Sequence, residues 1–425
     1  MSAPRIDHGG AVSVDPEALR ETASRIATVV EEFERARRAI EGALLAVSAM
    51  PVQEADIDPS ALLGSRDRVE ALRGDGEEAV TGVRLMADVY EYVELQVAAE
   101  VLAVDDGAAA DALRLRLDRL AAADDRIPDM ATVLRAGWEE RRFEGLNGQN
   151  TWGGLLTPVF GAAALAGAVG GRGVVQPWMR LSGTPDPVAV APVASSRPWS
   201  APAGIAESLR RMPRGDTGAQ VAVERYTMPD GSRRFVAYVL GTQSAGAGGR
   251  EPWDMRSNVE LYTGQRSASY EATRVALAAS GAVPGDEVDV VAHSQAGMIA
   301  AHLALEGEYD VRVQITAGSP VSPVLGDDRT LVQLAHTDDV VRALAGGGSA
   351  GGSGSPDSFT ATSVDDAVVG PTDAWRPHLL ASYVELAEEV DASGDPRVEA
   401  LDEFWRGLDD AVSIDRTEYR AERVE

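Results

Sequence analysis

The chain has 425 residues, 44% of them hydrophobic and 25% charged, which are ordinary globular values and exclude wholesale disorder. The 39 Lys and Arg residues against 67 Asp and Glu residues give a net charge of -28. This charge repels phosphate backbones and excludes nucleic acid as a partner. Because the chain has no cysteine, disulfides, thiolate metal sites and a cysteine nucleophile are also excluded. The length predicts two or three domains.

The first region, residues 1–150, is expected to be an all-α helical bundle. Residues 1–10 lack the basic start and apolar run of a general secretory signal, so any export would use another route. In the first helix, Asp15 and Pro16 form a start signal and Pro51 marks the end. A heptad stripe of apolar residues predicts that this helix packs along another helix. Its members are Leu19, Ile26, Phe33, Ile40 and Val47.

Two further helical stretches complete the predicted bundle. Apolar residues step by threes and fours from Val69 to Val101, with a predicted break around residues 74–76, where two glycines stand. A third stretch runs from Leu113 to Trp138 and is expected to be interrupted at Pro128.

The next region, residues 151–217, is expected to be a connection. An uncharged run at 145–171 is rich in glycine, so it is a poor membrane span and better interpreted as a buried or lid-like helix. Whether this run contacts a membrane is left open. Pro, Gly, Ser and Ala dominate residues 172–217, which predicts a linker or a loosely wrapped segment.

Residues 218–425 are expected to form an α/β domain with a mostly parallel central sheet. Short β-branched runs alternate with helical stretches, a pattern typical of a sheet covered on both faces. The runs at 220–228 and 233–240 flank the turn at Pro229–Ser232 and predict a β-hairpin. Later strands are predicted at 288–292, 311–316, 330–335 and 358–362, with helices at 267–280 and 298–305.

The segment Asp289–Ala300 carries the strongest chemical signal. A strand leads into Ser294, which has Ala292 and Ala296 two residues away on either side, and a helix follows. Small flanking residues are needed at a sharp strand-to-helix turn that holds a nucleophilic serine. The backbone amide of Gln295 then lies at the helix N-terminus, where it can bind a developing oxyanion. Alternatively, Ser294 only ends the strand and caps the next helix.

A serine nucleophile requires a histidine base and a carboxylate that orients it. Among five histidines, His378 follows the last predicted strand, which is the position of the base when the chain order is Ser, acid, His. The acid is expected after a preceding strand, where Asp339 is preferred and Asp338 is the reserve. The alternative role of these two aspartates is helix capping.

These features resemble the α/β-hydrolase superfamily, and within it the lipases of the fungal class-three type. The resemblance covers roughly residues 220–390 and rests on the Ser294 turn, on His336–Val341 and on Leu240–Thr242. It implies an α/β-hydrolase fold, a Ser294–His378–Asp339 triad, and an oxyanion hole in which Thr242 joins Gln295. It also implies a carboxylic ester or lipid ester as substrate, with no metal or organic cofactor. Glycines usual in the family's serine turn are replaced here by Ala292 and Ala296.

The helical region resembles the helical hairpins of type VII secretion substrates of actinobacteria. Tyr90 and Glu94 fit the family's Tyr-x-x-x-Asp/Glu export element at a helix end, and Trp152–Gly154 imitates its Trp-x-Gly turn. The resemblance implies a secreted or cell-surface protein, the alternative being a cytoplasmic one. It also implies a helical partner protein or self-association through the bundle. The alternative function is therefore an exported interaction or toxin-like module whose hydrolase fold is a non-catalytic scaffold.

Overall fold

The computed structural model describes residues 4–8, 16–49, 59–103, 107–141, 173–214, 217–346, 348, 353–365 and 375–424. The chain divides into two compact units. One is the helical unit, Val14–Arg135, and the other, the sheet unit, combines Met1–Ser13 with Ala136–Glu425. The helical unit therefore ends before residue 150, and the start of the chain belongs with the sheet.

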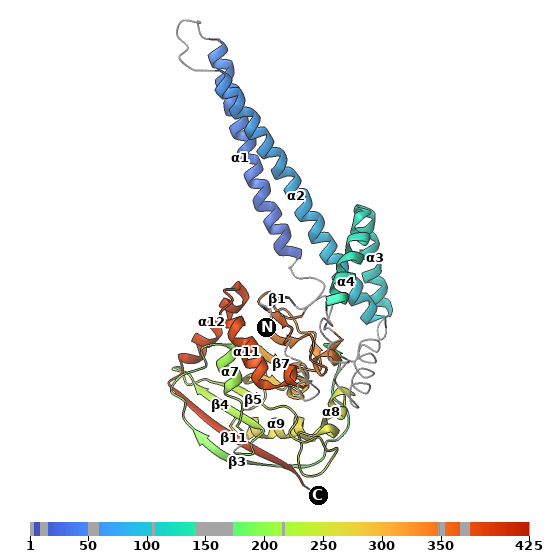
Figure 1. Cartoon of the computed structure of the whole chain (residues 1–425), viewed down its shortest axis with the longest axis vertical. Coiled ribbons are helices and arrows are strands. Elements are labelled where there is room, and N and C mark those ends of the chain that lie inside the picture. The colour runs from blue at the N-terminus through green and yellow to red at the C-terminus, as the bar shows by residue number, and fades with distance from the viewer. Residues whose placement is uncertain are drawn as a thin grey trace. The chain divides into compact units, whose positions relative to one another are not determined.

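The helical unit is built on a long antiparallel hairpin of α1 (Pro16–Ser48) and α2 (Pro59–Leu102), drawn in blue in Figure 1. Ion pairs join its two helices at both ends of the contact, since Arg20 pairs with Asp88 at 3.0 Å and Arg37 with Glu70 at 3.6 Å. The predicted break at residues 74–76 is wrong. A Cβ added at Gly76 would lie 2.6 Å from Val30 Cγ2, so the glycine permits close packing within a continuous helix.

Two shorter helices, α3 (Gly107–Ala123) and α4 (Arg126–Arg141), complete the helical region. Pro128 lies in the first turn of α4, where a missing backbone donor does no harm, so it begins a helix rather than interrupting one. Ion pairs from Arg116 to Glu91 (2.6 Å) and from Arg135 to Glu100 (2.9 Å) tie α3 and α4 to α2.

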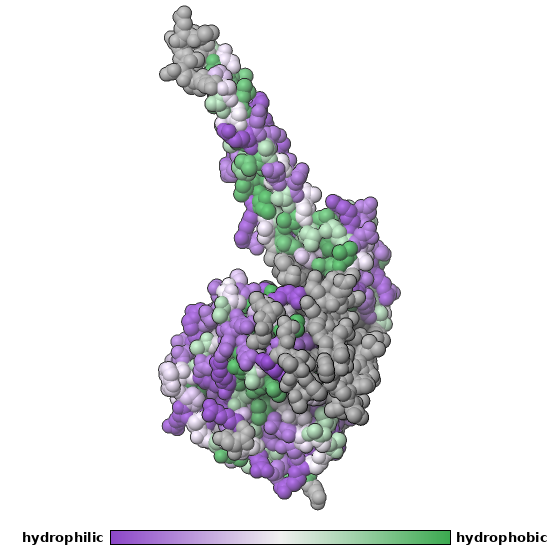
Figure 2. Space-filling view, in the orientation of Figure 1, coloured by the Kyte–Doolittle hydropathy of each residue, from purple (hydrophilic) through white to green (hydrophobic). Residues whose placement is uncertain are grey.

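The surface of the α1–α2 hairpin is not uniformly polar. Val29, Leu45, Leu63 and Leu72 are large apolar residues that remain exposed along it, and green patches interrupt the purple on this hairpin in Figure 2. Tyr90 and Glu94 lie inside α2, about three and two turns before its end at Leu102. Trp152 and the run at 145–171 lie outside the described residues. Within the described part of the chain, no helix is long and apolar enough to cross a membrane.

The sheet unit contains a nine-stranded sheet with the order β1-β10-β9-β7-β6-β5-β4-β11-β3. Five neighbouring strands, β10, β9, β7, β6 and β5, run parallel to one another. On one side β1 pairs antiparallel with β10, and on the other side β4, β11 and β3 each pair antiparallel with the strand before them in this order. The bounds are β1 Arg5–Asp7, β3 Val188–Ser196, β4 Val221–Thr227, β5 Arg233–Val239, β6 Glu287–His293, β7 Val313–Ala317, β9 Thr330–His336, β10 Phe359–Ser363 and β11 Ser413–Arg423. Two short strands, β2 (Val174–Val175) and β8 (Ser322–Pro323), pair separately.

Helices cover both faces of the large sheet, as the alternation predicted (Figure 1). One apolar core packs α8 (Met255–Tyr262), α9 (Ala268–Ala279) and α10 (Ala296–Glu306) against the sheet. A second core on the opposite face holds α7 (Ile205–Arg210), α11 (Leu380–Asp391) and α12 (Pro396–Asp409). Successive residues of a strand, such as Phe235 and Val236, enter opposite cores, because side chains alternate across a strand.

The predicted β4–β5 hairpin is confirmed, as Val221 to Thr227 pair antiparallel with Arg233 to Val239. The expectation of a linker over 172–217 is wrong in part, since β3 and α7 lie there. β3 is an edge strand of the sequence VAVAPVASS. Its alanines, serines and single proline resemble a linker, and the proline is tolerated at a sheet edge. Residues near the N-terminus are also structured, because β1 pairs with β10 and His8 bonds the Ser358 carbonyl at 3.0 Å.

Candidate active site

Ser294 occupies a strained turn between β6 and α10. Its φ of 55° is the only positive value at a non-glycine residue in the described part of the chain, and such a conformation stores about 1–3 kcal/mol that the surrounding fold must offset. The turn leaves no room for larger neighbours. A Cβ at Gly241 would lie 2.7 Å from Ser294 Cβ, and one at Gly297 would lie 2.3 Å from Ser319 Oγ.

Three side chains from the carboxyl ends of parallel strands meet at this turn. His378, in the short helix η3 (Arg376–His378) that follows β10, has its Nε2 2.8 Å from Ser294 Oγ. Its Nδ1 lies 2.7 Å from Oδ2 of Asp339, which follows β9. An ionised carboxylate only accepts hydrogen bonds, so Nδ1 carries the ring hydrogen and Nε2 accepts from the serine hydroxyl. This arrangement allows the imidazole to remove the serine proton.

Asp339 is the carboxylate of this set, and the reserve, Asp338, is not. The Asp339 side chain is fully buried and also accepts from Tyr383 Oη (2.7 Å) and the Val341 amide (2.8 Å). Burial raises the pKa of Asp339, but His378 and these donors outweigh burial and hold the pKa below its usual value. Asp338 instead accepts from the Asp365 amide at 3.2 Å, and burial raises its pKa.

Tyr383 supports the acid from the first turn of α11. Burial and the neighbouring Asp339 charge raise the pKa of Tyr383 well above its ordinary value, so the phenol keeps its proton and donates it. The same oxygen accepts from the His336 amide at 3.2 Å. Gly318 passes close by, because a Cβ there would lie 2.8 Å from the Tyr383 ring. Sequence reasoning missed Tyr383, and no local pattern at that position distinguishes it from a core residue.

Thr242 and Gln295 lie where the oxyanion hole is expected. Gln295 is the N-cap residue of α10, and Thr242 follows Gly241 against the serine turn. The backbone amides of both donate no hydrogen bond to other described residues. Thr242 Oγ1 accepts from Asn258 Nδ2 of α8 at 2.9 Å. Gln295 Nε2 donates to the Asp254 carbonyl at 3.2 Å, so both residues are fixed while their amides stay available.

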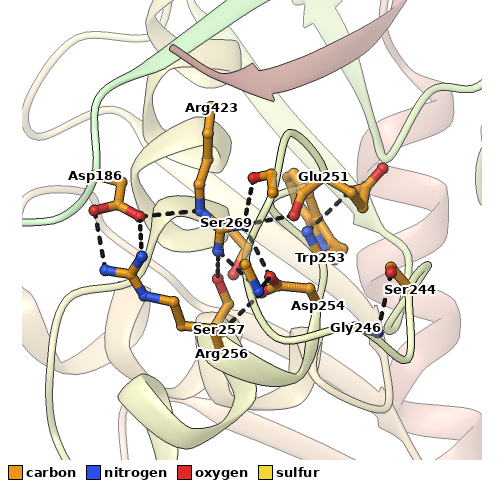
Figure 3. A network of polar contacts seen from close by, with 12 residues as sticks. Asp186, Ser244, Gly246, Glu251, Trp253, Asp254, Arg256, Ser257, Ser269 and Arg423 are labelled. Carbon is orange, nitrogen blue, oxygen red and sulfur yellow. Dashed lines mark hydrogen bonds and ion pairs between the residues drawn. The ribbon is translucent and has the colours of Figure 1, made fainter. Parts of the chain in front are cut away.

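The loop after β5 is anchored to the C-terminal strand by Arg423 (Figure 3). The guanidinium holds Asp254 through two hydrogen bonds of 2.9 Å and also donates to Ser257 Oγ and the Glu251 carbonyl. Asp254 in turn caps α8 by accepting from the Ser257 amide at 2.9 Å. The network therefore fixes the helix whose Asn258 holds Thr242.

His293 is a second residue that sequence reasoning underestimated. It ends β6 immediately before Ser294, and its Nε2 lies 3.0 Å from the backbone oxygen of His378. Burial, reinforced by the neighbouring His378 ring, lowers the pKa of His293 to about 3, so the ring of His293 is neutral. His302 is buried within α10, and burial lowers its pKa to about 4. Within the described residues, Ser294 Oγ is hydrogen-bonded to the ring of His378 and not to the ring of His293 or His302.

Comparisons with known proteins identify no family. No family model, no curated protein and no solved structure matches the chain. Clusters of three or more His, Cys, Asp or Glu with the geometry of a metal site are absent from the described residues. The fold defines a mixed α/β protein with an N-terminal helical region and a mostly parallel central sheet.

Proposed function

We propose that this protein is a serine hydrolase that cleaves carboxylic esters through an acyl-enzyme on Ser294. The observation that carries the proposal is the chain of two hydrogen bonds, Ser294 Oγ to His378 Nε2 at 2.8 Å and His378 Nδ1 to Asp339 Oδ2 at 2.7 Å. The strained conformation of Ser294 supports it, because φ of 55° is a feature of serines presented to substrate by a tight turn.

In the proposed reaction, Ser294 Oγ attacks the ester carbonyl carbon while His378 Nε2 takes the hydroxyl proton. The amides of Thr242 and Gln295 bind the negative oxygen of the tetrahedral intermediate, and each such donor contributes about 3 kcal/mol. The alcohol leaves with the proton that His378 returns. Water then attacks the acyl-enzyme, again giving its proton to His378, and releases the acid and free Ser294. Asp339 stays ionised and orients the imidazole.

The proposed family is the α/β-hydrolase superfamily, with the class-three lipases as the nearest type. The order Ser294, Asp339, His378 along the chain and the location of the three residues after the parallel strands β6, β9 and β10 support this assignment. A lipid-like or other carboxylic ester is the proposed substrate class.

A fluorophosphonate probe tests the proposal directly, since it modifies only an activated serine. The intact protein should be labelled, and Ser294→Ala should abolish labelling because the attacking oxygen is gone. His378→Ala should lose labelling as well, because the base is removed. Ser232→Ala, at the β4–β5 turn, is the control and should be labelled like the wild type.

Labelling that persists in Ser294→Ala would reject the proposal. A properly folded wild type that is never labelled would favour the alternative, a non-catalytic sheet unit attached to a helical interaction module. For that module we retain two proposals, export by a type VII-like route and a helical partner bound along the exposed apolar residues of α1 and α2.

A further inference from the structure

Arg342 is a buried cation beside the candidate active site that has no carboxylate partner. Taken as a whole residue, it is the only arginine counted as buried among the described residues, with 8% of its surface exposed. Its Nη1 donates to the Ser319 carbonyl (3.3 Å) and to Ser322 Oγ (3.1 Å). No Asp or Glu of the described chain lies within ion-pair distance of it.

Three arginines of the described residues whose side chains are 7–14% exposed all have carboxylate partners. Arg423 meets Asp254 in the network of Figure 3, Arg211 meets Glu224, and Arg416 meets Glu224 and Glu418. A buried charge without a counter-ion is strongly unfavourable. The chain has 67 acidic residues and only 39 basic ones, so carboxylate partners are plentiful. The absence of one at Arg342 is therefore unusual.

Two guanidinium nitrogens of Arg342 lack a partner within the described residues. Nη1 has two hydrogen-bond acceptors there, whereas Nε and Nη2 have none. A planar guanidinium with two such N–H groups matches the geometry of a carboxylate or phosphate.

Arg342 also lies next to the reacting groups. It stands three residues after Asp339 on the turn where the Ala343 amide bonds the Asp339 carbonyl at 3.0 Å. Its partner Ser319 packs against Gly297 in the first turn of α10, the helix that begins at the Ser294 turn. The charge of Asp339 acts favourably on Arg342 from beyond ion-pair distance, but the Asp339 carboxylate accepts its side-chain hydrogen bonds from His378 and Tyr383 and not from Arg342.

We infer that Arg342 binds an anionic group of the substrate, so that the preferred ester carries a carboxylate or a phosphate in addition to the bond that is cleaved. This inference rests on the proposed function of Ser294. It narrows the substrate from any ester to an ester with a negative charge. Arg342 is in this view a specificity residue, and the bonds to Ser319 and Ser322 hold its guanidinium in place.

Matched fluorophosphonate probes test the inference without knowledge of the natural ester. Three sets of probes are used, each with alkyl chains of graded length. The chains end in a hydroxyl in the first set, a carboxylate in the second and a phosphate in the third, and the rate of Ser294 labelling is measured for every probe. At the best chain length, the wild type should react about tenfold or more faster with an anionic probe than with the neutral one. The faster of the two anionic sets identifies carboxylate or phosphate as the recognised group.

Arg342→Gln retains donors for Ser319 and Ser322 but removes the charge. It should react at the wild-type rate with the neutral probes and lose the preference for anionic ones, whereas Arg342→Lys should keep part of that preference. Equal rates for neutral and anionic probes in the wild type would overturn the inference, whatever the variants do. A Gln variant slowed equally with all probes would overturn it too, because Arg342 would then be structural. Absence of labelling by any probe would instead reject the proposed function.

Discussion

The ring of His293 donates a hydrogen bond from Nε2 to the backbone oxygen of His378 over 3.0 Å. A carbonyl oxygen only accepts, so Nε2 carries the hydrogen, and the lowered pKa, about 3, keeps the ring neutral. The residue before the proposed nucleophile thereby holds the backbone of the proposed base.

Replacing His293 tests this positioning role. His293→Phe removes the donor and should lower kcat by roughly tenfold to a hundredfold, because a displacement of about 1 Å at the reacting groups has an effect of that size. KM should change little, since substrate contacts are retained. His293→Gln can still donate and should recover most of the loss. Both variants are compared on one p-nitrophenyl ester, and a Phe variant with wild-type kcat would show that the bond is dispensable.

Gly318 is predicted to be intolerant of a methyl group. Its φ is +61°, and a Cβ would lie 2.8 Å from the Tyr383 ring and 3.2 Å from Asp339 Oδ2. Gly318→Ala should therefore displace the acid and slow labelling of Ser294 at least tenfold.

Gly183→Ala is the matched control for Gly318→Ala. Gly183 has a similar φ of +79° but nothing within 4 Å of a new Cβ, so only the backbone strain of about 1–2 kcal/mol remains. Thermal unfolding and labelling rates are measured for both. Equal labelling rates in the two variants would contradict the role assigned to the contact with Tyr383 and Asp339.

Asp289, buried in β6, should make stability depend on pH. Burial, together with the charge of Glu287, raises the pKa of Asp289 to about 7, whereas the unfolded chain has a value of about 3.9. The folded state then binds more protons, so this group's contribution to the free energy of unfolding falls as pH rises from about 4 to 7. Asp289→Asn keeps an acceptor for the Val313 amide, which bonds Oδ1 at 2.8 Å, and removes the titration.

Urea unfolding at pH 5 and pH 8 measures this effect. The stability of Asp289→Asn relative to wild type should increase by roughly 2–3 kcal/mol between the two pH values. Asp415→Asn is the control. The hydrogen bond from Arg225 lowers the pKa of Asp415, so that carboxylate is ionised in folded and unfolded chains throughout this range and its variant should show no such change. An Asp289→Asn difference that does not vary with pH would refute the prediction.

The proposed export element is tested at Tyr90. Tyr90→Ala should keep the protein inside producing cells, because the aromatic half of the Tyr-x-x-x-Glu spacing is lost. Tyr92→Ala lies two residues away on the same helix α2 and should be released normally. The measurement is the fraction of protein in the medium against that in cells. Normal release of Tyr90→Ala would remove the type VII interpretation and leave the Ser294 proposal untouched.

Local patterns in the chain were sufficient to predict much of the molecule. Small flanking residues predicted the turn at Ser294, the Pro-Asp-Gly-Ser segment predicted the β4–β5 hairpin, and apolar periodicity predicted the paired long helices. Chain order also singled out His378 and the pair Asp338 and Asp339. Apart from the chain order, each of these signals is carried by residues close together in sequence, because turn sterics and helix or strand periodicity are short-range constraints.

The remaining features depend on which strands pair and how loops fold over their ends. Asp338 and Asp339 are neighbours with the same chemistry, and only the turn after β9 decides that Asp339 faces His378. Tyr383 contacts the acid and His293 contacts the base, and in both pairs the two residues are distant along the chain. The burial of Arg342 without a carboxylate partner also depends on which distant residues pack around it. Hydrogen-bond partners and counter-ions of this kind are set by the tertiary packing of strand ends and helices, and no local sequence pattern encodes them.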